Sequence, residues 1–323
     1  MKAVYVPDYY PLFRCIAADC RHSCCIGWEI DVDEEALTRF DGVAGALGER
    51  LKREIDREAD PPCFRLDERE RCPFLNQNGL CDLITELGED ALCQICADHP
   101  RFRNPLYDRV ELGLGLCCEA AAELILSREE PFSLIRLPDR EAARERTAHS
   151  PQEPADPLTD ALLTAREAVL TVVLDRSRAL SDRIRHVLTA LDIHLPMSTY
   201  GNWSELLSDL ERLDPAWDGV LEALAELTDD MASELDGETS TAYEQLLVYF
   251  LYRYLTAEDD GRPALLQVRV AFAVLATLLI HAMVRATALP LTEIARMFSS
   301  EIEYSEENLE RFLDWIEDGE REW

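Results

Sequence analysis

The chain has 323 residues, 47% of them hydrophobic, so it is long enough to bury one large core or two ordinary ones. It carries 64 acidic and 32 basic residues, which gives a formal net charge of −32. A surface this acidic repels nucleic-acid phosphates and anionic lipid, so we expect neither as a partner. It would attract a basic protein, although acidity that serves only solubility explains the same charge.

The N-terminus and the most apolar stretch bear on localisation. The first ten residues, MKAVYVPDYY, lack the apolar core of a secretory signal. Residues 270–284 are the most apolar stretch, but they fall short of the ~20 residues that a membrane span needs. They predict a buried core helix instead. We therefore expect a soluble, cytoplasmic protein.

Cysteine placement is the strongest signal, because all eleven cysteines lie within the first 118 residues. The odd count, two adjacent pairs and the lack of an export signal argue against a disulfide framework. Clustered thiols in a reducing compartment usually bind metal or carry redox chemistry. Three groups stand out: Cys15, Cys20, Cys24 and Cys25; Cys72, Cys81 and Cys96; and Cys117 with Cys118.

The cysteine spacing leaves the metal open. Thiolates in short loops suit either zinc or an iron–sulfur cluster. Zinc sites prefer C-x2-C pairs, a spacing that only Cys93 and Cys96 have, whereas C-x4-C followed closely by a third cysteine is nearer to iron–sulfur loops. Eight ligands can form two sites, or one site with spare thiols. His22 and His99 are further candidate ligands or ordinary histidines, and we expect Cys63 and Cys93 to be ordinary thiols.

The N-terminal part predicts short elements. Residues 27–32 alternate like a brief strand, and Asp33 is suited to cap a helix that begins at Glu34. A polar helix is predicted over 47–57, and another over 119–127. The latter starts directly after Cys118, where a helix dipole favours thiolate.

The remainder predicts a linker and then helices. Residues 128–158 are charged and contain proline, which is typical of a linker. Apolar residues then recur at helical spacing over 161–174, 179–193, 203–213, 220–235, 243–255, 265–287, 291–298 and 305–316. We predict a mostly α fold in which a cysteine-rich metal-binding part, residues 1–127, packs with its short irregular elements on a C-terminal helical bundle, residues 159–323.

Three N-terminal motifs stand out: FRCIAADCRHSCCIGWEIDVD (13–33), CPFLNQNGLCDLITELGEDALCQICADHPR (72–101) and GLCCEAAAELIL (115–126). They resemble the flagellin lysine N-methylase (FliB-like) family and, more distantly, the YkgJ-type zinc- or iron-chelating cysteine-cluster proteins. YEQLLVYFLYRYL (243–255) resembles the family's aromatic helix, with its arginine at Arg253. IEYSEENLERFL (302–313) resembles its acidic block, with Tyr304 where a histidine is expected.

The resemblance implies methyl transfer from S-adenosylmethionine to lysine side chains of a surface protein such as flagellin, with a [4Fe-4S] cluster involved. It implies metal ligation at Cys15, Cys20, Cys24, Cys25, Cys72, Cys81, Cys96 and Cys118, zinc being the alternative metal. The sequence has no dinucleotide-type glycine loop, since Gly113-Leu-Gly115 lacks a third glycine. An ordinary Rossmann methyltransferase is therefore not expected, and an open iron position is one candidate docking point for S-adenosylmethionine.

Lysine methylation has a chemical requirement that points to further residues. The amine, with a pKa of ~10.4, must lose its proton before it attacks a methyl group. A desolvated aromatic pocket with a carboxylate or phenolate base would serve. The candidates are Tyr249, Tyr252, Tyr254, Glu244 and Glu303, from which we predict Tyr249 and Glu303 as catalytic, together with Arg253. The alternative function is a non-catalytic zinc- or iron-binding protein that carries metal, senses it or transfers electrons.

Overall fold

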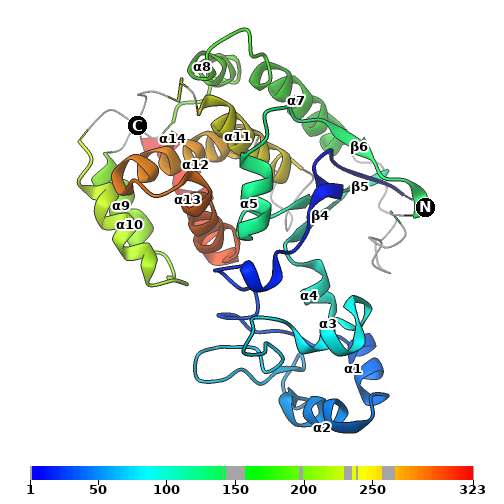
Figure 1. Ribbon diagram of the computed structural model, residues 1–323. Helices are drawn as coiled ribbons and strands as arrows, with labels where there is room; N and C mark the ends of the chain where they lie inside the picture. The colour runs from blue at the N-terminus through cyan, green and yellow to red at the C-terminus, as the bar shows by residue number, and fades with distance from the viewer. Residues whose placement is uncertain are drawn as a thin grey trace. The chain divides into compact units, whose positions relative to one another are not determined.

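The chain folds into two compact units in a computed structural model that describes residues 2–140, 142, 157–195, 199–228, 235–237, 239–256 and 266–322 (Figure 1). Unit 1 comprises Met1–Phe13, Arg103–Cys117 and Ala121–Trp323. Unit 2 comprises Arg14–Phe102 and Cys118–Ala120. Unit 2 is therefore an insertion in the sequence of unit 1, whereas the sequence analysis placed its boundary at residue 127.

Unit 1 contains a four-stranded sheet in the order β4-β5-β1-β6. The central strand β1 (Ala3–Pro7) pairs in parallel with β5 (Arg109–Leu114) and antiparallel with β6 (Leu134–Arg136). The outer strand β4 (Arg101–Pro105) lies beside β5. Strand β6 lies within residues 128–158, which the sequence analysis predicted to be a linker. The sequence did not indicate this strand, because three residues are too few to show an alternation of apolar and polar side chains.

Helices make up most of unit 1, which confirms the prediction of a mostly α fold. They are α5 (Glu119–Leu126), α7 (Pro157–Val173), α8 (Leu180–Ala190), α9 (Tyr200–Ser208), α10 (Ala216–Ala225), α11 (Ser240–Tyr254), α12 (Leu266–Thr287), α13 (Leu291–Phe298) and α14 (Glu306–Glu322). A π-helix, η4 (Ser299–Glu303), joins α13 to α14. Helix α5 starts directly after Cys118, as predicted. Helix α10 ends at Ala225, earlier than the predicted helix over 220–235, of which residues 229–234 lie outside the described range.

The long helix α12 lies in the core of unit 1, where α10, α11, α13 and α14 pack against it. Among the described residues it is the one helix long and apolar enough to cross a membrane. Its most apolar window is 72% buried inside the structure. A core helix has the same length and composition, and this degree of burial matches the sequence prediction for residues 270–284.

Unit 2 is built from short elements around a hydrophobic core that includes Phe40, Phe64 and Phe74. Its helices and strands are η2 (Ala17–Asp19), α1 (Glu34–Asp41), α2 (Gly45–Glu54), β2 (Ile55–Asp56), β3 (Cys63–Phe64), α3 (Asp82–Leu87), η3 (Glu89–Ala91) and α4 (Gln94–Asp98). The Asp33 carboxylate accepts a hydrogen bond from Ala36 N at 2.9 Å, which confirms the predicted cap. Its second oxygen accepts from Gln94 N at 2.7 Å, so one side chain holds the starts of α1 and α4.

The predicted strand over residues 27–32 is wrong. The segment makes only isolated bridges, Ile26 with Arg71 and Asp31 with Cys63. Gly27 has φ +90°, a left-handed conformation that breaks the extended path between these two bridges. The alternation of apolar residues therefore reflects burial in a loop rather than a continuous ladder.

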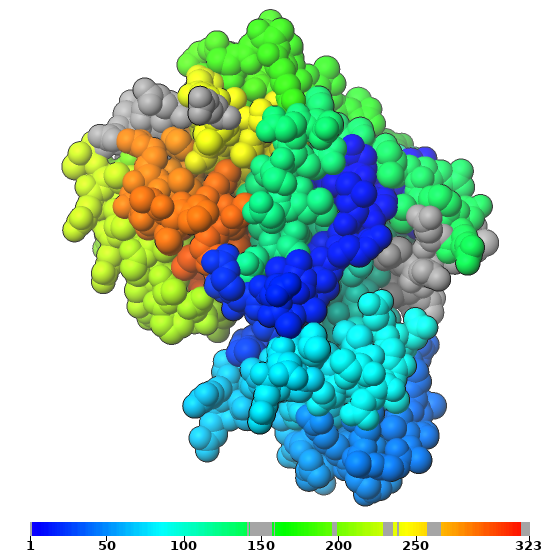
Figure 2. All heavy atoms as spheres, in the orientation of Figure 1, coloured from blue at the N-terminus to red at the C-terminus, as the bar shows by residue number. Residues whose placement is uncertain are grey.

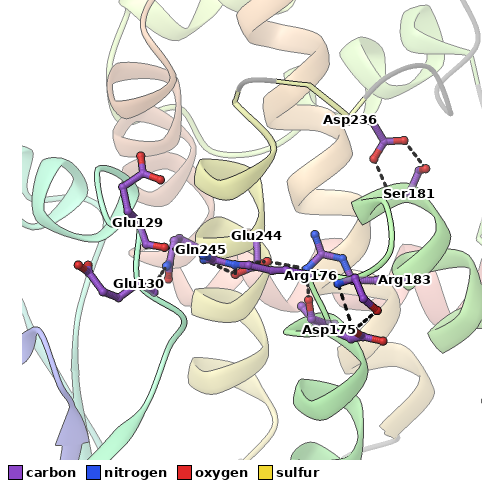
Figure 3. Close-up of polar contacts among 11 residues, drawn as sticks. Glu129, Glu130, Asp175, Arg176, Ser181, Arg183, Asp236, Glu244 and Gln245 are labelled. Atoms are coloured by element: carbon purple, nitrogen blue, oxygen red, sulfur yellow. Dashed lines mark hydrogen bonds and ion pairs between the residues drawn. The ribbon is translucent and has the colours of Figure 1, made fainter.

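A buried ion network joins the α7–α8 turn to α11 in unit 1 (Figure 3). Glu244 is 1% exposed and accepts hydrogen bonds from Arg183 at 2.5 Å and from Arg176 at 2.8 Å. Arg176 also donates to Glu129 O at 2.5 Å, and Gln245 donates to Glu130 O at 2.7 Å. The network explains why α11 carries a charged residue at a core position.

Replacing Glu244 with glutamine should strongly destabilise the protein. Arg183, whose side chain is 4% exposed, would then lose the carboxylate that balances its buried charge. Removing one partner of such a pair costs about 3–5 kcal/mol. We expect a loss of that size in the free energy of unfolding, measured by urea denaturation and circular dichroism.

The matched control is Arg185→Gln on α8, the helix that carries Arg183, because the ion pair of Arg185 with Asp182 is exposed on both sides. An exposed pair contributes at most about 1 kcal/mol, so this variant should unfold almost like the parent. Equal effects of the two substitutions would contradict the structural role assigned to Glu244.

Candidate cysteine centre and buried tyrosine–glutamate cluster

Every cysteine except Cys117 lies in unit 2, and all eleven are free thiols. They fall into two groups by their immediate neighbours. We call the first group the outer thiols, because its members are exposed or half-buried: Cys15, Cys20, Cys24 and Cys118. We call the second group the inner thiols, because its members pack into or against the hydrophobic core of unit 2: Cys25, Cys72, Cys81 and Cys96.

The outer thiols gather where the Cys20 loop is fastened to the start of α5. Cys20 Sγ lies 3.8 Å from Glu119 Oε2, and Arg21 donates to the same carboxylate through N and Nε, each at 2.9 Å. Because Glu119 follows Cys118 directly, these bonds hold Cys20 near Cys118. Burial is the main cause that raises the pKa of the Cys20 thiol, and the nearby Glu119, Cys118 and Cys15 raise it further.

The inner thiols are brought together by pairings between loops. Cys72 N donates to Cys25 O at 2.8 Å, and Cys81 forms an isolated bridge with Leu75. Burial raises the pKa of Cys72 to about 12, with further contributions from Cys25, Cys96 and Cys81. By contrast, hydrogen bonding from Cys24 is the main cause that lowers the pKa of Cys25 to about 7, aided by Ser23 and Arg71.

Two cysteines predicted to be ordinary thiols occupy different surroundings. Cys93 is fully buried in the core of unit 2, and its side chain is hydrogen-bonded to Cys96. Cys63 lies in β3, where burial and nearby carboxylates, Glu29 first among them, raise the pKa of its thiol. Cys93 is thus a direct neighbour of an inner thiol, which its spacing to Cys96 already indicated.

His99 packs with its ring centroid 6.0 Å from that of Trp28. Burial, and then the charge of Arg101, lowers the pKa of His99 to about 4. The imidazole is therefore neutral near pH 7, the state in which a histidine packs in a core or binds a metal.

The donor chemistry of both groups suits a metal centre, because cysteine sulfur is the usual ligand of structural zinc and of iron–sulfur clusters. Within the described residues, no three Cys, His, Asp or Glu side chains converge on a point that a single metal ion could occupy. The thiolates of a cluster stand further apart than those around one ion, since irons and sulfides lie between them. The thiolates of a cluster therefore need not converge on one point as the ligands of a single ion do.

A second candidate site lies in unit 1, where the structure brings together the three predicted catalytic residues, Tyr249, Arg253 and Glu303. The Glu303 carboxylate accepts hydrogen bonds from the hydroxyls of Tyr249, at 2.9 and 3.0 Å, and of Tyr254, at 2.8 Å. Arg253 Nε lies 3.4 Å from the same carboxylate, and its Nη1 donates to the Tyr249 hydroxyl at 2.8 Å. The Glu303 side chain is completely buried.

Helix geometry explains why these side chains meet. Tyr249 and Arg253 are four residues apart on α11, which places them on one face. Glu303 comes from η4, whose wider turn directs it inward, while Glu301 accepts hydrogen bonds from Leu213 N and Asp214 N. Such π-helical turns are rare and frequently occur at functional sites. The sequence pattern gave no sign of this turn, because it lies between two ordinary apolar repeats.

Tyr304 and Gly115 complete the tyrosine–glutamate cluster, and the sequence analysis assigned a role to neither. The Arg253 guanidinium lies 5.3 Å from the Tyr304 ring centroid, and the Tyr304 hydroxyl is hydrogen-bonded to Cys117. A Cβ atom on Gly115 would collide with that hydroxyl, so only glycine leaves room for it. Tyr304 is 44% exposed, although its hydroxyl points inward, and so forms the rim of the cluster.

Two other candidates lie elsewhere in unit 1. The Tyr252 hydroxyl donates to Leu112 O at 2.9 Å, and Arg166 lies over its ring at 5.4 Å. Glu244 belongs to the buried ion network of Figure 3. The structure therefore gives both residues partners away from Glu303 and separates them from the cluster.

Burial fixes the protonation of the tyrosines. Desolvation is the main cause that raises the pKa of Tyr249 and of Tyr254 well above the usual value of 10.0. Both remain neutral phenols that donate to Glu303. Desolvation alone would lower the pKa of Arg253, but its neighbours Tyr249, Tyr254 and Glu303 raise that pKa well above its usual value, so Arg253 supplies the positive charge of the cluster.

Comparison with known proteins gives one family model and several curated relatives. Residues 166–322, which include Tyr249, Arg253 and Glu303, match the family model described as the FliB lysine N-methylase C-terminal domain. The lysine-N-methylases of Salmonella typhimurium (strain LT2) and Salmonella choleraesuis (strain SC-B67) are each 26% identical over 145 residues, covering 42% of this chain and 35% of each relative. The flagellar biosynthetic protein FliU of Salmonella muenchen is 25% identical over 145 residues, covering 42% of this chain and 84% of its own.

Fold and site thus define a mostly helical protein with a cysteine-rich insertion and a buried tyrosine–glutamate cluster. The chain is similar to the FliB-like flagellin lysine N-methylase family, whose C-terminal domain model matches residues 166–322, and this confirms the resemblance seen in the sequence. Its match spans about a third of the length of the two lysine-N-methylases. No solved structure matches it. The more distant resemblance to YkgJ-type proteins stays a prediction.

The raised tyrosine pKa values predict alkaline unfolding. A tyrosine whose folded pKa lies above its unfolded value of 10.0 stabilises the fold fully below pH 10, and that stability is lost as the pH rises further. Tyr249, Tyr252 and Tyr254 should therefore ionise only when the protein unfolds. Parallel pH titrations of tyrosinate absorbance and helical circular dichroism test this, and complete ionisation before any loss of helix would contradict it.

Proposed function

We propose that the protein is an iron–sulfur-dependent protein lysine N-methyltransferase that uses S-adenosylmethionine and acts on flagellin or a similar surface protein in the cytoplasm. The printed names of the family model and of the relatives support the methylase activity. The observation that carries the proposal is the buried cluster of Glu303, Tyr249 and Arg253 within the part of the chain that matches the methylase domain.

The reaction makes one bond and breaks one. The lone pair of a neutral lysine amine attacks the methyl carbon, the carbon–sulfur bond breaks, and the sulfonium of S-adenosylmethionine becomes a neutral thioether. The positive charge moves to the methylated amine. An ammonium group has no lone pair, so the enzyme must favour the neutral amine first.

The tyrosine–glutamate cluster offers a physical means to do so. Arg253 already neutralises Glu303, and the surrounding tyrosines are neutral, so no unbalanced carboxylate would attract an ammonium ion. A lysine that reaches the Tyr304 rim would lie beside the Arg253 guanidinium, and a neighbouring cation lowers the pKa of an amine. Tyr304, which is 44% exposed at the edge of the cluster, would provide an apolar surface for the lysine stem.

The cysteines of unit 2 are the proposed ligands of the cluster, and the acidic surface is the proposed attraction for a lysine-bearing partner. When bound, an iron–sulfur cluster supplies iron that can bind donor groups or exchange an electron. The protein's own part is to hold the thiolates together in loops that Asp33 and Glu119 fasten to helices.

Methyl transfer tests the proposal directly. Holo-protein incubated with S-adenosylmethionine and flagellin should add methyl groups to lysines, detected by mass spectrometry. Tyr249→Phe removes a donor to Glu303, and we expect its rate to fall about 10- to 100-fold, as the loss of one charge-assisted hydrogen bond allows.

The control is Tyr243→Phe, because Tyr243 is equally buried on α11 but contacts His281 through its ring rather than Glu303 through its hydroxyl. Its rate should stay near that of the parent, with circular dichroism confirming that both variants fold. A folded holo-protein that methylates no lysine-bearing partner would remove the enzyme proposal and favour the metal-carrier alternative.

Metal content tests the cofactor separately. Protein prepared without air should be brown and contain iron and acid-labile sulfide, and Cys63→Ser should keep both, because Cys63 lies among carboxylates in β3. A colourless protein with stoichiometric zinc would overturn the iron–sulfur proposal while leaving a metal centre in place.

A further inference from the structure

The adjacent residues Cys24 and Cys25 have separate sets of neighbours. Cys24 interacts with Cys15 and Cys118, both of which raise its pKa after its hydrogen bond with Cys25 and burial. Cys25 interacts with the inner thiols and lies against the hydrophobic core of unit 2. The two groups of thiols therefore meet at one peptide bond.

The four inner thiols are mutual neighbours, and Cys93 adjoins them through its hydrogen bond with Cys96. All pairs among these four residues, Cys25, Cys72, Cys81 and Cys96, interact with one another. Backbone contacts fix them: Cys72 N bonds Cys25 O at 2.8 Å, and Asp82 N bonds Phe74 O at 2.8 Å, which closes the loop that leads to Cys81. Phe74 and Leu83 beside them are fully buried, so this set belongs to the core.

The outer thiols form a second set with its own fastening. Cys15 interacts with Cys20 and Cys24, and so does Cys118. The Glu119 carboxylate holds the Cys20 loop by three hydrogen bonds, and Cys15 Sγ accepts from Ala17 N at 3.4 Å. Cys15 and Cys24 are exposed, and Figure 2 shows atoms of this N-terminal segment, in dark blue, at the surface.

We propose that unit 2 holds two separate four-thiolate metal centres, an outer one at Cys15, Cys20, Cys24 and Cys118 and an inner one at Cys25, Cys72, Cys81 and Cys96. This inference rests on the proposed function only in taking the metal to be an iron–sulfur cluster. Four thiolates are the usual complement of one such cluster, so eight thiols in two sets of four suit two centres better than one centre with spare thiols.

The different burial of the two sets gives the centres different roles. The inner centre lies against the hydrophobic core that includes Phe74, so its metal binding stabilises the fold of unit 2. The outer centre has exposed thiols and is open to solvent and to small molecules. Solvent exposure changes the stability and the potential of a cluster, so the two centres should respond differently to chelators and to reductants.

Iron and acid-labile sulfide per chain test the inference in anaerobic holo-protein. The parent should contain roughly eight irons per chain if both centres hold [4Fe-4S] clusters. The double variant Cys15→Ser/Cys118→Ser should lose about half of the iron and sulfide and keep the circular dichroism of the parent, because it removes outer thiols only. Cys63→Ser should keep the full amount.

A second measurement avoids any variant that fails to fold. Iron release from the parent to a strong chelator should follow two phases of similar amplitude, with the inner half released only as unit 2 unfolds. Loss of all iron in the outer double variant, an unchanged iron content in it, or release in one phase from a protein with roughly four irons per chain would overturn the two-centre proposal.

These results are independent of methyl transfer. A protein with one cluster that methylates flagellin would remove the two-centre inference and keep the proposed function. A protein with two centres that methylates nothing would do the reverse.

Discussion

The carboxylate of Glu303 is the point on which the architecture of unit 1 depends. It is completely buried, and it is stable there only because two phenols donate to it and Arg253 balances its charge. Its partners come from α11, which packs on the core helix α12, and the Tyr249 hydroxyl also accepts from Leu116 N at 3.3 Å. One ion therefore links the C-terminal π-helix, the aromatic helix and the turn before α5. Burying a charged carboxylate is costly, so Glu303 has a structural or chemical purpose. Glu303, Tyr249 and Arg253 all lie within the residues that match the methylase family model.

Local patterns predicted much of this fold, and long-range pairing accounts for what they missed. The spacing of apolar residues over 291–298 predicted both ends of α13 correctly, and Asp33 was correctly predicted to cap the N-terminus of α1. The sequence did not indicate strand β6 or the π-helix η4. A strand of three residues and a π-helix of five residues are too short to show a recognisable repeat of apolar residues. At the site, residue chemistry pointed to Tyr249 and Glu303, but the role of Gly115 follows only from the approach of Tyr304, which lies 189 positions away in sequence (304 less 115).

Buried charge recurs in unit 1, and its arrangement separates structural groups from candidate functional ones. Glu111 pairs with Arg166 at 2.8 Å and with Arg109 at 2.9 Å, and Glu244 pairs with two arginines in the same way. Each of these carboxylates is therefore paired with two guanidinium groups. Glu303 instead has one arginine and two phenols, and a partly exposed tyrosine at its edge. Phenols donate without adding charge, so this site stays close to electrically neutral, which is the condition that a neutral amine requires.

The pair Cys117–Cys118 shows how far chemistry is set by surroundings rather than by residue type. The chain passes from unit 1 to unit 2 between these two residues. The Cys117 side chain bonds the Tyr304 hydroxyl of the tyrosine–glutamate cluster, whereas Cys118 is a neighbour of Cys20 and Cys24. Cys24 and Cys25 are divided in the same manner between the outer thiols and the inner thiols, which pack into or against the core of unit 2. Each adjacent pair therefore marks a boundary between two environments, and counting cysteines in the sequence could not reveal it, because the count treats neighbours as equivalent.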